Sequence, residues 1–163
     1  MSKIGRFFKK IQPYLLFCAL SLGVGLLSVL LTRENMTLYD EVVNPPLTPP
    51  GWLFPIAWGL LYVLMGVGAA RVYEKRTDDP PAAKDAFAFF GMNLFVNFAW
   101  SIIFFNYRAF WFAFVWLLFL LAVIIRMTVA FAKLDKVAAY LQIPYILWVT
   151  FAGYLTAGIA VLN

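Results

Sequence analysis

The sequence predicts an all-α fold, an integral membrane bundle of five transmembrane helices, and two observations carry this prediction. Hydrophobic residues make up 64% of the 163 residues and charged residues only 13%, whereas a soluble domain is about 25% charged. The charged residues also leave five long gaps, each near the roughly 20 apolar residues that a helix needs to cross a bilayer core. The expected spans are residues 11–32, 51–73, 86–106, 109–132 and 137–161, within a single domain covering residues 1–163.

The basic residues predict the orientation of this bundle. With the N-terminus inside and the C-terminus outside, the inner segments and span ends carry every lysine and arginine except Arg33 and Arg108. Such a bias in short loops follows the positive-inside rule. The net charge of +5 therefore reflects topology, and no nucleic-acid partner is expected because no soluble domain carries a basic patch. The bias favours a bacterial cell membrane.

The N-terminal segment, residues 1–28, has the basic start and apolar run of a signal peptide. Its apolar run is too long for that role and no Ala-x-Ala site follows, so we interpret it as a retained first span. Cys18 is the only cysteine and lies inside this span. We therefore expect it to be a small apolar filler.

Proline and capping residues predict where several helices begin. Thr48 is expected to cap the second span, with Pro49 and Pro50 in its first turn, where an amide has no intrahelical partner. Asp79 is expected to cap the third span, with Pro80 at the first helical position.

Two prolines and two pairs of small residues are also predicted to shape the bundle. Pro55 and Pro144 fall inside spans and should kink them or leave nearby carbonyls free. The pairs Ala19-x-x-x-Gly23 and Gly153-x-x-x-Ala157 allow close helix contact. Packing within one chain is the favoured interpretation of these pairs, and a homodimer face is the alternative.

A polar stripe lies on the third span, where Asn93, Asn97 and Ser101 follow one another at four-residue spacing with Trp100 beside them. Polar groups that face lipid are costly, so the stripe should face the bundle interior. One interpretation is interhelical bonding worth on the order of 1 kcal/mol per bond. The other is polar anchoring of a ligand.

Two aromatic stripes accompany it: Trp58 and Tyr62 on the second span, and Tyr145, Trp148 and Ala152 on the fifth. Trp58 and Trp148 lie deep enough that each indole N–H needs a partner. A pocket lined by these rings and the asparagine stripe would suit a large, flat, apolar ligand. Simple packing is the competing interpretation.

The residues that are missing exclude other classes of site. The chain has no histidine and one cysteine, so no metal site and no cofactor are expected. No carboxylate lies inside an expected span, which argues against a proton-coupled antiporter. The sequence contains neither a nucleophile–base pair nor a phosphate-binding glycine loop, so a conventional hydrolase or kinase is not expected.

Motif residues along the whole chain make the sequence resemble the TspO/MBR family, the translocator or tryptophan-rich sensory proteins. They are Tyr39, Pro45 and Thr48–Pro50 in the first loop; Trp58, Tyr62 and Gly66; Asn97, Trp100, Phe104 and Phe105; and Pro144, Tyr145, Trp148, Phe151, Ala152, Leu162 and Asn163. The resemblance implies five membrane helices and a pocket, closed by the first loop, that binds tetrapyrroles and other flat apolar ligands.

Carried over by this resemblance, Trp58 and Trp148 would face a porphyrin and could take part in its photo-oxidation. Tyr39, Pro49, Tyr62, Asn97, Trp100 and Ala152 would line the pocket; Asn93 and Tyr145 join them from the stripes. Three functions follow: a receptor or sensor for tetrapyrroles such as protoporphyrin IX, a light- and oxygen-dependent porphyrin-degrading enzyme, or a carrier of porphyrin-like compounds. The sensor is the preferred hypothesis.

The sequence departs from the family pattern at several positions. Leu38 and Leu47 stand where the family often has tryptophan, Asn44 where lysine is common, and Thr156 where asparagine is usual. Fewer loop tryptophans and an acidic loop should weaken binding of anionic ligands. The family's C-terminal sterol motif is absent from this sequence, so sterol transport is not the favoured role.

Overall fold

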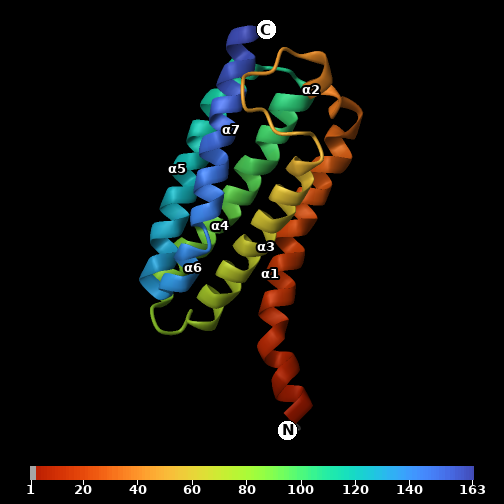
Figure 1. Ribbon diagram of the computed structural model, residues 1–163. Coiled ribbons are helices and arrows are strands. Elements are labelled where there is room, and N and C mark those ends of the chain that lie inside the picture. Colours follow the sequence, from red (N-terminus) through yellow and green to blue (C-terminus); the bar gives the residue numbers. More distant parts are fainter. Residues whose placement is uncertain (1–2) are drawn as a thin grey trace.

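In this computed structural model the described part of the chain is residues 3–163, with side chains from residue 8 onward. Every regular element in that range is a helix, and five stretches are long and apolar enough to cross a membrane (Figure 1). The predicted all-α class and the count of five spans are confirmed. The direction in which the bundle crosses the membrane stays a prediction.

The long helices pack side by side in one bundle. Their bounds are α1 Lys3–Thr32, α3 Leu53–Glu74, α4 Pro80–Ser101, α5 Phe110–Leu134 and α7 Ile143–Leu162, with the short α6 Lys136–Tyr140 ahead of α7. Helix α1 packs against α3 and α4, α5 packs against α4 and α7, and α6 contacts α3 (Figure 1). The remaining elements are a 3-10 turn at Arg33–Asn35, α2 at Leu38–Glu41, and a π-helix at Ile102–Asn106 that extends α4.

The two ends of the bundle differ in content. The end that we call the loop end carries residues 33–52, the turn at residues 107–109 and the C-terminus. The opposite end, which we call the basic end, carries the turn at residues 75–79 and the single residue between α5 and α6. In Figure 1, the N-terminal part of α1 projects past the rest of the bundle at the basic end.

One predicted cap is confirmed and one is wrong. Asp79 Oδ1 accepts a hydrogen bond from the amide of Ala82 at 3.1 Å, and α4 begins at Pro80. Helix α3, however, begins at Leu53, and the Thr48 hydroxyl donates to the carbonyl of Pro45 at 2.7 Å instead of capping a helix. The physical reason is that a residue before proline is pushed toward extended backbone, and Thr48 and Pro49 both precede one.

The predictions for the two prolines inside spans also have different outcomes. Pro55 lies in the first turn of α3, where its missing N–H has no acceptor to lose, so the predicted kink is wrong there. Pro144 lies in the first turn of α7, and the fifth span is interrupted between Tyr140 and Ile143. This break just ahead of Pro144 agrees with the prediction that Pro144 would kink its span or leave nearby carbonyls free.

Glycine permits the closest approach between α1 and α3. A Cβ placed on Gly66 would lie 2.6 Å from the Cα of Cys18, so only glycine fits this contact. Cys18 packs here as expected for a small filler. Gly23 of the predicted Ala19–Gly23 pair has nothing within 4 Å. Close packing of that pair within the chain is therefore wrong, because the crossing point lies elsewhere on α1; Gly153 makes only an ordinary contact, at 3.7 Å from Leu117.

A buried carboxylate joins three helices at the basic end. Asp135 accepts hydrogen bonds from Nε and Nη2 of Arg71 at 3.1 and 3.0 Å, and Lys75 Nζ lies 2.9 Å away. It also caps α6 by accepting from the amide of Ala138 at 2.7 Å. Burial alone would raise the pKa of Asp135, but these cationic and amide donors hold that pKa well below its usual range.

Candidate functional site

The polar stripe on α4 faces the bundle interior, as predicted, and most of its hydrogen bonds cross to other helices. Asn93 and Asn97 are buried. The amide of Asn97 donates to the Tyr145 hydroxyl at 2.8 Å, and that hydroxyl donates to Asn93 Oδ1 at 2.9 Å. Asn93 Nδ2 also lies 3.1 Å from the sulfur of Met65. These bonds join α4 to α7 and α3, which is the interhelical bonding of the first interpretation.

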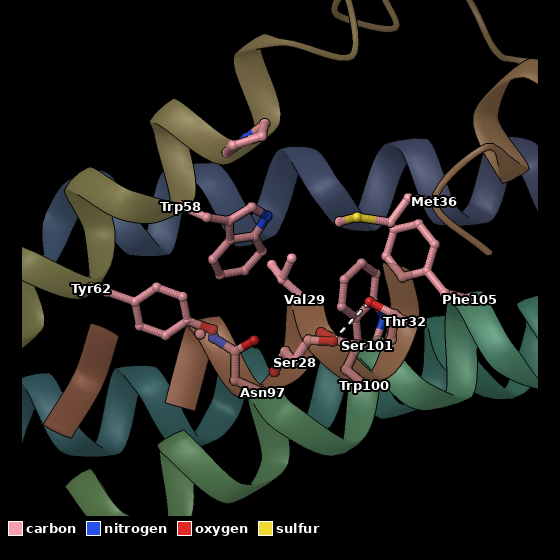
Figure 2. Close-up of a pocket in the computed structure, with 12 residues that line it drawn as sticks. Ser28, Val29, Thr32, Met36, Trp58, Tyr62, Asn97, Trp100, Ser101 and Phe105 are labelled. Atoms are coloured by element: carbon pink, nitrogen blue, oxygen red, sulfur yellow. Dashed lines mark hydrogen bonds between the residues drawn. The ribbon is translucent and has the colours of Figure 1, made fainter. Parts of the chain in front are cut away.

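A cavity of about 210 Å³ lies next to this network, toward the loop end. Figure 2 shows its walls, which come from α1, α3 and α4; we call it the aromatic cavity. It is lined by the rings of Trp58, Tyr62, Trp100 and Phe105, by the polar side chains Ser28, Thr32, Asn97 and Ser101, and by Gly25, Val29, Met36 and Pro55.

The rings of the cavity belong to a larger aromatic network. Trp100 stacks on Phe104 with ring centroids 5.2 Å apart, and Trp58 lies 6.5 Å from Trp100 and 6.2 Å from Tyr145. Tyr39 lies 5.8 Å from Phe104 on the side of the loop. Offset and edge contacts of this kind contribute about 0.5–1.5 kcal/mol each beyond their buried area. The network therefore makes the cavity wall rigid on the side of α4.

Four of the ten predicted ligand-binding residues line this cavity: Trp58, Tyr62, Asn97 and Trp100. Asn93 and Tyr145 lie behind them, hydrogen-bonded to one another. The other four, Tyr39, Pro49, Trp148 and Ala152, are outside its lining.

Among the described residues no ring contact joins Trp58 to Trp148. Trp148 packs edge-on against Phe54 at 6.0 Å, and Phe54 stacks on Tyr39 at 4.9 Å. Trp148 therefore joins the network through Phe54 and Tyr39, whereas Trp58 contacts Trp100 directly.

Two buried indole N–H groups, those of Trp100 and Trp148, have no hydrogen-bond partner among the described residues. Leaving a buried donor unpaired costs about 1–3 kcal/mol. Trp100 belongs to the cavity wall (Figure 2), so an acceptor on a bound molecule would recover that cost. This donor gives the site its most specific chemical feature.

Sequence reasoning missed the contribution of α1. Ser28 and Thr32 enter the cavity lining from this helix, with the Thr32 hydroxyl donating to the Ser28 carbonyl at 2.8 Å (Figure 2). A signal was present, because Ser21, Ser28 and Thr32 are buried polar residues in the apolar part of α1 and share one face of it.

The π-helix places the last ring of the cavity. The amide of Tyr107 donates to the carbonyl of Ile102 at 3.2 Å, five residues back. This wider turn leaves Phe104 buried and Phe105 in the cavity lining. Single π turns in helices often occur at functional sites.

Several contacts fasten the loop over this end. The side chain of Asn163 bonds both the amide and the carbonyl of Val43, at 2.9 and 3.0 Å. Tyr154 donates to the carbonyl of Pro46 at 2.8 Å, and Arg108 pairs with Glu41 at 2.7 Å. Met36, just ahead of α2, reaches the cavity. Among the described residues no group of three or more histidine, cysteine, aspartate or glutamate side chains could hold a metal ion.

The fold and this site define an all-helical integral membrane protein with an aromatic cavity beneath a structured first loop. The sequence model of the TspO/MBR family matches residues 16–162, and the chain belongs to that family. The resemblance drawn from the motif residues is thereby confirmed.

Several curated relatives are similar over most of their length. The chain is 32% identical to a tryptophan-rich protein TspO of Chlorobaculum tepidum over 159 residues, covering 95% of this chain and 98% of the relative. It is 32% identical to the translocator protein of Homo sapiens over 135 residues, covering 83% and 80%. It is also 32% identical to a tryptophan-rich sensory protein of Cereibacter sphaeroides over 114 residues, covering 70% and 69%.

Proposed function

We propose that this protein is a membrane receptor or sensor that binds a tetrapyrrole such as protoporphyrin IX, or another flat apolar ligand, in the aromatic cavity. The observation that carries the proposal is the unpartnered indole N–H of Trp100 in a wall that combines aromatic rings with a few hydroxyl and amide groups. Apolar pockets with a few placed polar groups are typical of small-molecule sites. The name of the Cereibacter sphaeroides relative, a tryptophan-rich sensory protein, supports the same class.

The wall chemistry fits a planar ligand with acceptor groups at its edge. Trp58, Trp100 and Phe105 offer ring faces for stacking. The Trp100 N–H would donate to a carbonyl or carboxylate oxygen of the ligand. Ser101 and Thr32 add hydroxyl groups to the same lining, so the ligand would be held by apolar area and oriented by a few hydrogen bonds.

The cavity volume sets a condition on this proposal. At about 210 Å³ it is smaller than the roughly 300–1,000 Å³ of most small-molecule pockets. A tetrapyrrole would therefore have to widen it. Met36, which is 40% exposed, lies on the side of the loop where such widening is easiest, so ligand binding should be coupled to displacement of residues 33–52.

The test is a titration of purified protein with protoporphyrin IX in the dark, followed by porphyrin absorbance. We expect saturable binding that Trp100→Phe weakens about fivefold, the equivalent of one lost hydrogen bond of about 1 kcal/mol. Trp111→Phe is the matched control, because Trp111 is 59% exposed and outside the cavity. Absence of saturable binding, or equal affinity of Trp100→Phe and wild type, would contradict the proposal.

The same titration tests the predicted role of Trp148. If the ligand stays within the aromatic cavity, Trp148→Phe binds as wild type does. If the ligand extends past Phe54 toward α7, Trp148→Phe is weakened, as the family resemblance implies.

A second candidate is light- and oxygen-dependent degradation of a bound porphyrin, with Trp58 and Trp148 as the reactive rings. The continuous aromatic network favours it, since the ring centroids that link Trp58 to Trp100 and Phe54 to Trp148 are 6.5 and 6.0 Å apart. Illumination should then convert several porphyrins per protein, and Trp58→Phe should abolish conversion. Bleaching of one porphyrin per protein would instead indicate a photosensitised side reaction.

A further inference from the structure

We propose that a groove between α1 and the end of α3 binds an anionic glycerophospholipid of the surrounding bilayer. This groove, which we call the α1–α3 groove, has a volume of about 560 Å³ and lies at the basic end, away from the aromatic cavity. Lys9, Leu16 and Phe17 contribute to one wall, and Tyr73, Glu74 and Arg76 to the other. The proposal is independent of the ligand proposed for the aromatic cavity.

The groove exists because α1 and α3 diverge. The two backbones touch at Gly66 and Cys18, and toward the basic end the ring of Phe17 lies between the helices, 5.7 Å from Tyr73 and 5.6 Å from Phe87. Figure 1 shows the N-terminal part of α1 leaving the bundle beyond this point. The result is an open groove with aromatic rings at its inner end.

The mouth of the groove is basic. The guanidinium carbon of Arg76 lies 3.8 Å from the centroid of the Tyr73 ring, and Nη1 donates to the Tyr73 carbonyl at 2.7 Å. These contacts orient the group but use one of its five N–H donors. Lys9 faces the groove from α1. The lining holds two basic residues, Lys9 and Arg76, and one acid, Glu74, whose Oε2 accepts a hydrogen bond from the Tyr14 hydroxyl at 2.9 Å.

The order of these groups along the helix matches an amphiphile. Lys9 and Lys10 precede the uncharged stretch that starts at residue 11, which places Lys9 at the membrane edge. Leu16 lies seven residues further along, roughly 10 Å deeper at 1.5 Å per residue. A lipid phosphate at Lys9 and Arg76 would therefore leave its acyl chain against Leu16 and Phe17. A free phosphate would leave that apolar part of the groove empty, which favours the lipid.

The test uses the full chain purified in a neutral detergent, with phosphatidylglycerol as probe and native mass spectrometry as readout. Each basic residue near a membrane surface strengthens binding of anionic lipid roughly fivefold. We therefore expect Lys9→Gln/Arg76→Gln to weaken phosphatidylglycerol binding roughly 25-fold. Lys133→Gln/Lys136→Gln removes the same charge from the same end outside the groove and should leave affinity within about twofold.

Three results would overturn the proposal: phosphatidylcholine binding as tightly as phosphatidylglycerol, equal loss in both double variants, or competition by glycerol 3-phosphate alone. A second measurement needs no substitution. Phosphatidylglycerol carrying a photoreactive acyl chain should cross-link the unaltered protein at Leu16, Phe17 and Tyr73. Cross-links spread evenly over the lipid-facing helices would also count against a site.

Discussion

The two ends of the bundle differ in how a buried polar group is bonded. At the basic end one carboxylate, that of Asp135, receives donors from two cationic side chains and a helix amide. At the loop end the buried indole N–H of Trp100, a residue of the cavity wall, has no partner among the described residues. A small membrane bundle can thus satisfy a buried carboxylate fully at one end and leave a buried donor without a partner beside a cavity at the other.

The means of closure differ as well. Midway along the helices, α1 and α3 meet backbone to backbone at Gly66 and Cys18, and at the basic end the buried carboxylate of Asp135 joins α3 to α6. At the loop end the closing contacts are exposed hydrogen bonds and one ion pair, such as Arg108 with Glu41, whose side chains are both 46% exposed. Exposed pairs contribute about 0–1 kcal/mol each, so the loop end should open at far lower cost than the basic end.

Removal of the Asp135 carboxylate should have the largest effect on stability. Asp135→Ala loses a helix cap and hydrogen bonds to two charged groups, and we expect a loss of about 3 kcal/mol in the free energy of unfolding. Arg71 and Lys75, 33% and 46% exposed, can still reach water, which limits the loss. Unfolding in detergent at pH 7 measures it, and a loss below about 0.5 kcal/mol would break the comparison.

The same residue predicts a pH dependence. Because the pKa of Asp135 is lowered on folding, its stabilisation is complete above its unfolded pKa of about 3.9 and is lost as the pH falls below that value. Asp135→Asn should therefore be less stable than wild type at pH 7, and the difference should shrink below about pH 4. A difference that stays constant down to pH 3 would assign the loss to another cause.

Adding a side chain at the contact between α1 and α3 should have the next largest effect on the free energy of unfolding. A methyl group on Gly66 meets backbone atoms of Cys18, so Gly66→Ala should cost about 2 kcal/mol through displacement of α1. Gly59→Ala is the control, because Gly59 lies on the same helix with nothing within 4 Å; it should be neutral or stabilising by up to about 1 kcal/mol. Equal melting temperatures for the two variants would contradict this packing.

Removal of the Tyr145 hydroxyl tests the boundary between the two ends. Tyr145→Phe leaves the Asn97 amide and the Asn93 oxygen without this partner. In membrane proteins such hydrogen bonds contribute about 0.6–2 kcal/mol, so we expect a loss of about 1 kcal/mol in the free energy of unfolding. A loss above about 3 kcal/mol would mean that the network, and not the basic end, holds the bundle together.

The smallest effect on stability is expected at the cavity itself. Trp100→Phe removes an N–H that has no partner among the described residues, so the free energy of unfolding should change by less than about 1 kcal/mol. Ligand affinity should fall in the same variant, and thermal melting with and without protoporphyrin IX separates the two. A large stability loss without ligand would show that Trp100 acts mainly in packing.

Features that depend on local sequence were predictable. The spans follow from runs without charge, and the cap at Asp79 from its position before Pro80. The inward direction of Asn93 and Asn97 follows from the cost of facing lipid. Each of these depends on the chain and its solvent alone.

Features that depend on residues distant in the chain could not be predicted from the sequence. The role of Asp135 could not be predicted, because its partner Arg71 lies 64 residues away in the chain. The aromatic stripe on α7 predicted a face for Trp148, but helical spacing does not determine which rings meet across the bundle, and Phe54 lies between Trp148 and Tyr39. The contribution of α1 to the cavity was missed for the same reason.

The π turn at residues 102–106 makes the cavity wall sensitive to a one-residue deletion. Its hydrogen-bonded ring holds one residue more than an α-helical turn, as the bond from Tyr107 to Ile102 records. Loss of one codon in this segment would remove the extra residue and restore α-helical spacing, which would change the directions in which the side chains of the segment itself point. Phe105 would swing out of the cavity wall while the reading frame, the hydropathy and the span count stayed almost unchanged. In a sequence alignment this deletion would be a single one-residue gap, although the cavity wall would have lost one of its rings.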